Sequence, residues 1–496
     1  MKVVFVDNFS LNFGVMYLAA VLEKAGYDVE LLLYPLSKWH GIDQYNRPEK
    51  YFNFEKISQE ILSKKPDILC FSVFSPNYLF FKNAAQAIKK RSHVPIIVGG
   101  VLPSLVPQLF LKNSLCDFLL RGEAEGIIVD LAESILSGNK EHPIPNLIYR
   151  NDHGAFITNA MASFVEDLDA LPFYKKNLYP NSSDQLFIIT SRGCPMKCAY
   201  CSAGTFTRLT VKTGAMIRRR SVNNVIAEIK AARNERSYKE IFFYDDFFIA
   251  DAQWLTEFSE TYAHEIGLPF YCLAFPATIT KNIAQLLATS GCKNVELGFQ
   301  TACEEYKKTV LSRKEDNRTV IQAMNILKEQ GIKVTIDHIF NLPGETRADI
   351  EQSLNFYLNN RIKSLSLFFL NYYPDSVLTQ YAYKSGIITP EQFEKIINNE
   401  LIGEQSYMGT VLDRKKAVET VKVAMLFRLI SFLPAKIVRW IFKTNSYRFF
   451  PANKFLYYGL SMLSELKNRD LNFILMTFFL AFKKPEQKAD PHNSMP

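Results

Sequence analysis

The chain has 496 residues, 48% of them apolar and 22% charged, so it exceeds one ordinary core and should form about three domains. This composition excludes a disordered, collagen-like or disulfide-framework protein. The formal net charge of +8 is modest and is not gathered into the basic blocks of a nucleic-acid-binding tail, so no nucleic-acid partner is expected.

The first residues, MKVVFVDNFS, lack the small-residue cleavage site of a signal peptide and indicate a strand, which predicts a cytoplasmic protein. No apolar run reaches the roughly 18 to 20 residues that a spanning helix needs, and the nearest, Phe473 to Phe482, is about half as long. In a reducing compartment the eight cysteines are expected to be thiols or metal ligands rather than disulfides.

Residues 1–140 alternate short apolar strands with helices. The expected strands lie at Val3–Val6, Ile68–Phe74, Ile96–Val98 and Phe118–Leu120. Continuous apolar runs are typical of strands buried on both faces, so the region predicts a doubly wound, Rossmann-like parallel sheet whose ligand crevice lies beyond the carboxyl ends of the strands. Candidate ligand contacts at those ends, or simple loop punctuation, are Asn8, Gly14, Ser75, Asn77, Gly99, Gly100, Gly122 and Glu123.

Residues 141–185 are mixed and contain prolines, which indicates a linker, and a second alternation fills residues 186–385. Its six expected strands lie at Leu186–Thr190, Glu240–Tyr244, Phe270–Leu273, Asn294–Gly298, Lys333–Ile339 and Ser364–Leu370. Helical patterns such as Val222–Ala232 and Thr319–Glu329 separate these strands. Six units of this kind predict a partial (β/α)6 barrel of the TIM type, with chemistry at the carboxyl ends of its strands.

A third region, residues 386–482, has a helical pattern, and the tail at 483–496 is expected to be disordered. Between Arg414 and Phe450 basic residues are interspersed with large apolar ones. Helices of this type either cap a domain with snorkelling lysines or lie on an anionic membrane surface. We favour the cap, as one wall of the substrate site, and keep peripheral membrane contact through residues 410–482 as the alternative.

Three of the cysteines, Cys194, Cys198 and Cys201, directly follow the first expected barrel strand at x3 and x2 spacing. Thiolates on one loop can converge on a soft metal centre, and three of them leave one corner of a four-iron cluster open to a substrate or cofactor. A structural zinc site would need a fourth Cys or His with second-pair spacing, and none follows nearby. The triplet therefore favours an iron–sulfur centre over zinc or coincidence.

This triplet, with Tyr200 before its last cysteine, resembles the cluster motif of the radical S-adenosylmethionine (SAM) superfamily. Further segments match the family's motifs in the same order, at Arg220–Ser221, Phe243–Phe248, Gly291–Thr301, Gly331–Thr346 and Tyr373–Leu378. The N-terminal region resembles the cobalamin-binding domain of the B12-binding subclass, at Tyr17–Val29, Val94–Gly100 and Cys116–Glu123. Over about residues 1–385 the chain is thus similar to class B radical SAM enzymes, which include cobalamin-dependent methyltransferases and proteins like anaerobic Mg-protoporphyrin monomethyl ester cyclase.

The resemblance implies three cofactors: a [4Fe-4S] cluster on the three cysteines, SAM at the cluster, and cobalamin in the N-terminal crevice. No Asp-x-His-x-x-Gly motif follows the first strand, and Leu102 stands where a His often follows the glycine pair. A His ligand to cobalt is therefore not expected, and a domain that has lost cobalamin is the alternative.

The residues expected to contact SAM are Tyr200, Asp245, Asp246, Glu296, Gln300, Phe340, Pro343 and Gly344. Asp245 and Asp246 end the second barrel strand, where a carboxylate can accept a hydrogen bond from the ammonium of SAM. Because adjacent strand residues face opposite ways, only one of the pair is expected to do so. Asn341 replaces the family's leading glycine before Pro343, and His338 is expected to be a core rather than a catalytic histidine.

The implied function is reductive cleavage of SAM to methionine and a 5′-deoxyadenosyl radical, with methylation of an unactivated carbon or phosphinate and methylcobalamin as the immediate methyl donor. The alternatives are non-methylating radical chemistry, such as oxidative cyclisation or ring rearrangement, and a cluster-bearing electron carrier. The implied partners are a small-molecule or lipid-like substrate and a one-electron reductant such as flavodoxin or ferredoxin.

Overall fold

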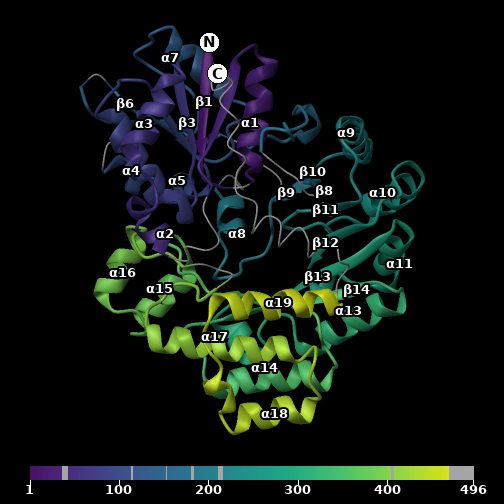
Figure 1. Cartoon of the computed structure of the whole chain (residues 1–496). Coiled ribbons are helices and arrows are strands. Elements are labelled where there is room, and N and C mark those ends of the chain that lie inside the picture. The colour runs from purple at the N-terminus through teal and green to yellow at the C-terminus, as the bar shows by residue number, and fades with distance from the viewer. Residues whose placement is uncertain are drawn as a thin grey trace, which may run out of the picture.

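The computed structural model describes residues 1–9, 11–35, 43–112, 115–151, 153–162, 164–179, 184–209, 216–403 and 407–468 (Figure 1). The predicted disordered tail at 483–496 and the end of the predicted helical region, 469–482, lie outside the described residues. No helix in the described part of the chain is long and apolar enough to cross a membrane.

The N-terminal domain is built on a seven-stranded sheet of order β2-β1-β3-β4-β5-β6-β7. Its first five strands are parallel and are β1 (Lys2–Asp7), β2 (Asp28–Leu33), β3 (Ile68–Ser72), β4 (Ile96–Gly99) and β5 (Phe118–Leu120). The connection direction reverses between β1 and β3, so the ligand crevice of a doubly wound fold is expected beyond the ends of these two strands.

Helices cover both faces of this sheet. Alternate residues of β1 point to opposite sides: Val3 and Phe5 join a core with α1 (Phe13–Lys24) and α7 (Ile128–Leu136), whereas Val4 and Val6 join one with α3 (Phe54–Ser63) and α4 (Tyr78–Lys89). Both faces of each strand are therefore buried, which explains the continuous apolar runs and confirms the predicted doubly wound sheet.

The segment predicted to be a linker, residues 141–185, adds two strands to this sheet. Strand β6 (Leu147–Arg150) pairs antiparallel with β5, and β7 (Phe156–Thr158) pairs antiparallel with β6. Strands of three or four residues are too short to show a periodicity in the sequence, and only β7 lies at the edge of the sheet. Strand β2 was also missed, because Asp28 and Glu30 interrupt its apolar pattern.

The second domain is an open barrel of six parallel strands in the order of the chain, β8-β11-β12-β13-β14-β15. The strands are β8 (Gln185–Ile188), β11 (Glu240–Phe243), β12 (Phe270–Ala274), β13 (Cys292–Gln300), β14 (Lys333–Phe340) and β15 (Leu365–Phe369). The helices between them are α9 (Val222–Glu235), α10 (Ala252–Glu265), α11 (Lys281–Thr289), α13 (Asn317–Glu329) and α14 (Arg347–Asn359). All six predicted strands are present, and the partial barrel is confirmed.

The C-terminal helices pack against the β15 side of the barrel (Figure 1). They are α15 (Val377–Lys384), α16 (Pro390–Ile397), α17 (Arg414–Leu429), α18 (Ala435–Lys443) and α19 (Lys454–Asn468). Phe427 of α17 contacts the rings of His338 and Phe340, and Arg428 donates a hydrogen bond of 2.6 Å to the carbonyl of Leu365. Helix α17 is therefore part of the barrel core, as the cap interpretation requires.

Contacts between the two domains bring the carboxyl ends of their strands toward each other. The rings of Phe13, at the start of α1, and Tyr244, directly after β11, lie 6.0 Å apart. The Asn399 side chain donates a hydrogen bond of 2.8 Å to the carbonyl of Ser75, which follows β3. The crevice of the first domain consequently faces the mouth of the barrel.

Candidate active site

The three cysteines lie on the loop between β9 (Ser191–Arg192) and α8 (Ser202–Thr207), beyond the carboxyl end of β8. Thr207 accepts a hydrogen bond of 3.1 Å from the Cys194 amide, which fastens the start of the loop to α8. Ala199 holds its end: its amide donates to the Leu311 carbonyl at 3.0 Å, and its carbonyl accepts from the Leu378 amide at 2.9 Å. The loop is thus tied to the segments that follow β13 and β15.

Gly193, immediately before the first cysteine, has a positive φ of +103°. A Cβ at this position would lie 2.0 Å from the carbonyl oxygen of Met216, a distance that no side chain tolerates. Only glycine allows both this backbone conformation and this close approach. The turn that points Cys194 into the barrel mouth therefore depends on Gly193.

The donor set, three cysteine thiols on one loop, fits a four-iron cluster with one iron left open, because soft thiolates are the ligands that such clusters take. Among the described residues no three His, Cys, Asp or Glu side chains are placed to hold a single ion. Burial raises the pKa of the Cys194 thiol to about 12 and also raises the pKa of Cys201, so both thiols keep their protons until a metal displaces them.

Arg313, which the sequence reasoning missed, lies behind this loop with only 2% of its surface exposed. Its Nη1 lies 3.9 Å from Cys198 Sγ and donates a 3.1 Å hydrogen bond to the Tyr200 hydroxyl. Its Nη2 donates to the Gly298 carbonyl at 2.7 Å, and its Nε pairs with Glu315. A permanent cation is therefore held against the Cys198 thiol, and Tyr200 is oriented by Arg313.

Two adjacent carboxylates at the end of β11 have different surroundings. Asp245 is fully buried and accepts hydrogen bonds from the Thr190 amide at 3.0 Å, the Thr190 hydroxyl at 2.8 Å and the Ser191 hydroxyl at 2.6 Å. Asp246 is exposed at the barrel mouth, although the surrounding protein still desolvates its carboxyl and raises its pKa, with Asp245 adding to the effect. Asp246 is also close enough to act electrostatically on Cys194 and Cys201. Of the predicted pair, Asp246 is the one available to a ligand.

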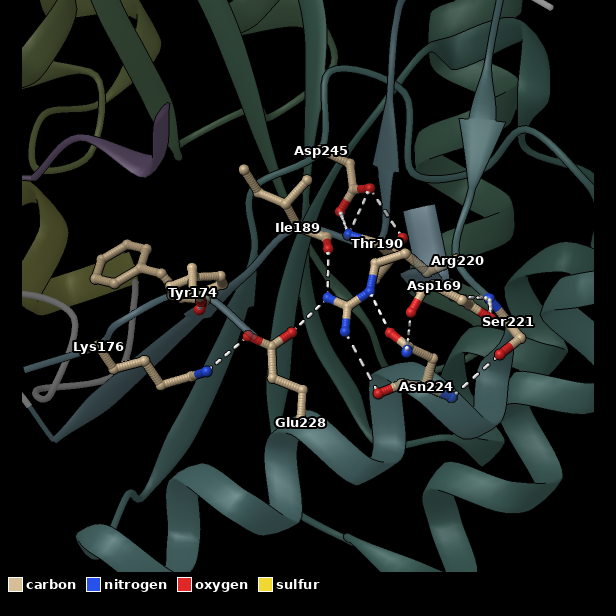
Figure 2. Close-up of polar contacts among 11 residues, drawn as sticks. Asp169, Tyr174, Lys176, Ile189, Thr190, Arg220, Ser221, Asn224, Glu228 and Asp245 are labelled. Carbon is tan, nitrogen blue, oxygen red and sulfur yellow. Dashed lines mark hydrogen bonds and ion pairs between the residues drawn. The ribbon is translucent and has the colours of Figure 1, made fainter. Parts of the chain in front are cut away.

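The Arg220–Ser221 segment fixes the end of β8 from the other side, as Figure 2 shows. Buried Arg220 donates to the Ile189 carbonyl at 3.1 Å and to Asn224 Oδ1 at 2.7 Å, and it pairs with buried Glu228. Lys176 completes the group with a 2.6 Å ion pair to Glu228. Ser221 caps α9 by accepting from the Asn224 amide. The sequence indicated no role for this motif. In the structure it anchors the end of β8 through the Ile189 carbonyl.

The other residues predicted to contact SAM follow β13 and β14. Gln300 is 6% exposed and has a φ of +73°, and its Oε1 is buried with no hydrogen-bond partner among the described residues. Phe340 packs in the core against Phe369 and Phe427, so only its backbone could reach a ligand. The orphaned oxygen of Gln300 at the barrel mouth is a feature that a polar ligand would satisfy.

The remaining predicted positions surround the same mouth. Glu296 is half-buried on β13. Pro343 accepts a 2.6 Å hydrogen bond from the Tyr306 hydroxyl through its carbonyl, and Gly344 is exposed in the turn that follows. His338 is fully buried, with Nδ1 2.9 Å from the Tyr357 hydroxyl, and burial lowers its pKa to about 3. His338 is thus a neutral core residue.

The crevice of the first domain contains one conspicuous polar side chain. Asn8, directly after β1, is 1% exposed, and both polar atoms of its amide are buried without a hydrogen-bond partner in the part of the chain that the structure describes. Its neighbour Asp7 is satisfied by the Tyr179 hydroxyl at 2.5 Å and the Asn12 amide at 3.0 Å. A buried amide with no partner is costly, so the crevice suits a cofactor rich in polar groups, as cobalamin is.

Several predicted cofactor contacts in this crevice are used by the protein itself. Asn77 Nδ2 donates to the Ser72 carbonyl at 3.0 Å, and a Cβ on Gly100 would lie 2.7 Å from the Val73 carbonyl. A Cβ on Gly122 would lie 2.4 Å from the Phe164 ring. A Cβ on Gly14 or Gly99 would meet only ordinary contacts, at 3.4 Å and 3.9 Å. Gly100 and Gly122 are therefore explained by packing alone.

Glu123 joins the two domains. Both of its carboxylate oxygens pair with Arg218 at 2.7 Å, and one accepts from the Val165 amide at 3.0 Å. Next to it Arg192, two residues before Cys194, pairs with Glu125 at 2.7 Å. These contacts commit the Glu123 carboxylate oxygens to Arg218 and Val165. The partners of Glu123 lie 42 to 95 residues away in the chain and gave no signal in the sequence.

A Rossmann-like domain whose crevice faces a cysteine loop in an open barrel defines a class of proteins with two cofactor sites. A family model described as the radical SAM superfamily matches residues 188–357, and one described as the B12 binding domain matches residues 5–132. Together they cover more than half of the chain. The chain belongs to the B12-binding radical SAM superfamily.

Relatives are distant in sequence. An uncharacterized methyltransferase of Pyrococcus horikoshii is 23% identical over 69% of this chain and 75% of its own length. Cytidylyl-2-hydroxyethylphosphonate methyltransferase of Streptomyces wedmorensis is 21% identical over 76% of this chain and 79% of its own.

Two solved structures share the fold. The radical SAM methyltransferase TsrM of Kitasatospora setae, with tryptophan and a SAM analogue bound, has a TM-score of 0.62 at 17% identity over 78% of this chain and 77% of its own. The cobalamin-dependent SAM radical enzyme OxsB, with aqua-cobalamin and SAM bound, has a TM-score of 0.63 at 15% identity over 97% of this chain and 75% of its own.

We expect opposite phenotypes from the two aspartates. Asp245→Ala removes the acceptor of three buried donors, the Thr190 amide, the Thr190 hydroxyl and the Ser191 hydroxyl, and should lower the free energy of unfolding by about 2 kcal/mol. Asp246→Asn should leave thermal unfolding unchanged and weaken SAM binding about tenfold, because a charged acceptor for an ammonium is lost. Thermal denaturation and equilibrium dialysis with SAM test both, and equal effects of the two variants on SAM binding would contradict the assignment.

The pH dependence of stability should contain a contribution from Glu345. Burial raises the pKa of its carboxyl to about 8, and Asp349 adds to the effect. The folded state therefore keeps a proton that the unfolded chain releases near pH 4.5, so this group makes stability fall as pH rises from about 4.5 to about 8. Glu345→Gln should flatten that fall in melting temperature, whereas Glu329→Gln, at an exposed position, should not. Identical slopes for all three proteins would refute it.

Proposed function

We propose that this protein is a cobalamin-dependent radical SAM enzyme that methylates an unactivated carbon or a phosphinate. The observation that carries the proposal is the juxtaposition of its two sites: the cysteine loop with an open side, and the Asn8 crevice across from it, with Phe13 and Tyr244 in contact between them. When bound, the cluster and cobalamin would supply the electron for SAM cleavage and the methyl group, respectively.

The protein's own residues would bind and orient the cluster, SAM and cobalamin. Cys194, Cys198 and Cys201 would be the cluster ligands, with Arg313 offsetting their negative charge. Asp246 would accept a hydrogen bond from the ammonium of SAM, and Gln300 Oε1 would accept one from another polar group of SAM. Asn8 would hydrogen-bond cobalamin. Position 102 holds Leu instead of His, so cobalamin would have no histidine ligand from this position.

Methylation is favoured over the alternatives by the relatives, of which two of the most similar are methyltransferases by name. Oxidative cyclisation or ring rearrangement with the same cofactors is the second candidate, supported by the match of an enzyme named as a cyclase, which covers 22% of this chain. A carrier of electrons would not need the polar crevice of the first domain. The substrate is a small molecule, which includes lipid-like compounds.

The reaction also requires partners that lie outside this chain. A one-electron reductant, such as flavodoxin or ferredoxin, would reduce the cluster. A cytoplasmic location would give the protein access to such a reductant. Both stay predictions.

Product analysis tests the proposal. Anaerobically reconstituted protein given SAM, hydroxocobalamin, a reductant and a substrate should form S-adenosylhomocysteine and 5′-deoxyadenosine together. The triple variant Cys194→Ser, Cys198→Ser, Cys201→Ser should form neither, while Cys303→Ser, which changes a cysteine outside the loop, should behave as the wild type. Formation of 5′-deoxyadenosine without S-adenosylhomocysteine would support the non-methylating alternative, and formation of neither by the wild type would refute the proposal.

A further inference from the structure

One side of the C-terminal helices has both bare apolar side chains and lysines. We call it the basic apolar surface and define it by Lys436, Ile437, Trp440 and Lys443 of α18 with Arg448 and Phe449 of the short helix η5 (Ser446–Phe449). Trp440 is 61% exposed, Ile437 45% and Phe449 88%. Exposed tryptophan and isoleucine on one helix are unusual unless something covers them.

Helix α18 has one face that is buried against the barrel and one face that is exposed. Val438 and Phe442 are buried, and Arg347 of α14 donates a 2.8 Å hydrogen bond to the Phe442 carbonyl, so this face packs on the barrel. On the opposite face Lys436, Ile437, Trp440 and Lys443 fall within roughly one third of the helix circumference. The burial of one apolar face therefore leaves a second one exposed, which packing among the described residues does not explain.

Charge is concentrated in the same region. Residues 414–468 contain eleven Lys and Arg against two Glu, a net charge of +9, which exceeds the +8 of the whole chain. The rest of the protein is thus nearly neutral. Among the described residues, eight of the sixteen exposed large apolar side chains also fall in this segment. Four of those eight lie on α19 and are Phe455, Leu456, Leu463 and Leu466.

The lysines of the surface are available to a partner. Lys436 and Lys443 are exposed and enter no ion pair among the described residues, whereas Arg448 is held by Glu419 at 2.7 Å. No acidic residue occurs between Glu419 and Glu465 to neutralise them. The surface consequently combines an uncompensated positive charge with apolar side chains, and a partner must offer both negative charge and an apolar interior.

We propose that the basic apolar surface binds the face of an anionic lipid bilayer. Lysine ammonium groups would pair with lipid phosphates, while Ile437, Trp440 and Phe449 enter the boundary between head groups and acyl chains. Tryptophan is enriched at that boundary because its ring is apolar and its N–H is polar. A nucleic acid would satisfy the lysines but leave Ile437 and Phe449 in water. The surface lies at the end of the molecule away from the N-terminal domain, so docking leaves both cofactor sites accessible (Figure 1).

Vesicle sedimentation with the full-length protein tests this proposal without any cofactor. The wild type should bind vesicles of phosphatidylcholine mixed with phosphatidylglycerol and bind phosphatidylcholine alone much more weakly, with binding that falls as salt rises. Lys436→Glu combined with Lys443→Glu should weaken binding to the mixed vesicles by more than about tenfold. Lys90→Glu with Lys328→Glu, an equal charge change at exposed positions elsewhere, should not.

The apolar part is tested separately. Ile437→Ser combined with Trp440→Ser should weaken vesicle binding at least tenfold while leaving the circular dichroism spectrum and melting temperature unchanged, because both side chains are exposed. Wild-type protein that stays in solution would overturn the proposal. So would vesicle binding that is unaffected in both surface variants, or tighter binding to double-stranded DNA than to anionic vesicles.

Discussion

The fold and its chemistry depend on how the chain is held where β8 passes into the cysteine loop. Asp245 holds Thr190 and Ser191 from the side of β11, and Arg220 holds Ile189 from the side of α9 (Figure 2). These anchors are buried charges, and a buried charge is tolerated only when its partners stay in place. The cost of moving either anchor fixes the backbone at this point, so the loop that carries the cysteines starts from a rigid position.

Charged side chains of opposite sign lie on two sides of the cysteine loop. Arg313 is positive on the side of Cys198, and Asp246 is negative on the open side toward Cys194 and Cys201. Three thiolates and their metal carry net negative charge, which the arginine offsets, while the exposed carboxylate is left to meet a cationic ligand. Ion pairs also join the two domains. Glu123 pairs with Arg218 and Glu125 pairs with Arg192, and these contacts hold the crevice opposite the barrel mouth.

The sequence was informative wherever a local pattern has one physical cause. Strands buried on both faces need continuous apolar runs, so β1, β3 and the six barrel strands could be located to within a few residues, and the cysteine spacing could be read as a cluster loop. The sequence did not predict the residues whose roles depend on partners distant in the chain. Arg313 is a single arginine on a loop, Glu123 stood in a glycine-rich segment typical of ligand contacts, and Asp245 differs from Asp246 only in what surrounds it. Strands β6 and β7 are too short to show a period, and the bare face of α18 becomes apparent only once its other face is buried.

The account rests on a cluster that three cysteines bind with one iron left for SAM. The most direct measurement is low-temperature electron paramagnetic resonance of anaerobically reconstituted, dithionite-reduced protein, recorded before and after SAM is added. We predict the signal of a reduced [4Fe-4S] cluster whose g values shift on addition of SAM, since a ligand that reaches the open iron changes its surroundings. A reduced cluster whose signal SAM leaves unchanged, or protein that takes up no iron and sulfide, would contradict the account.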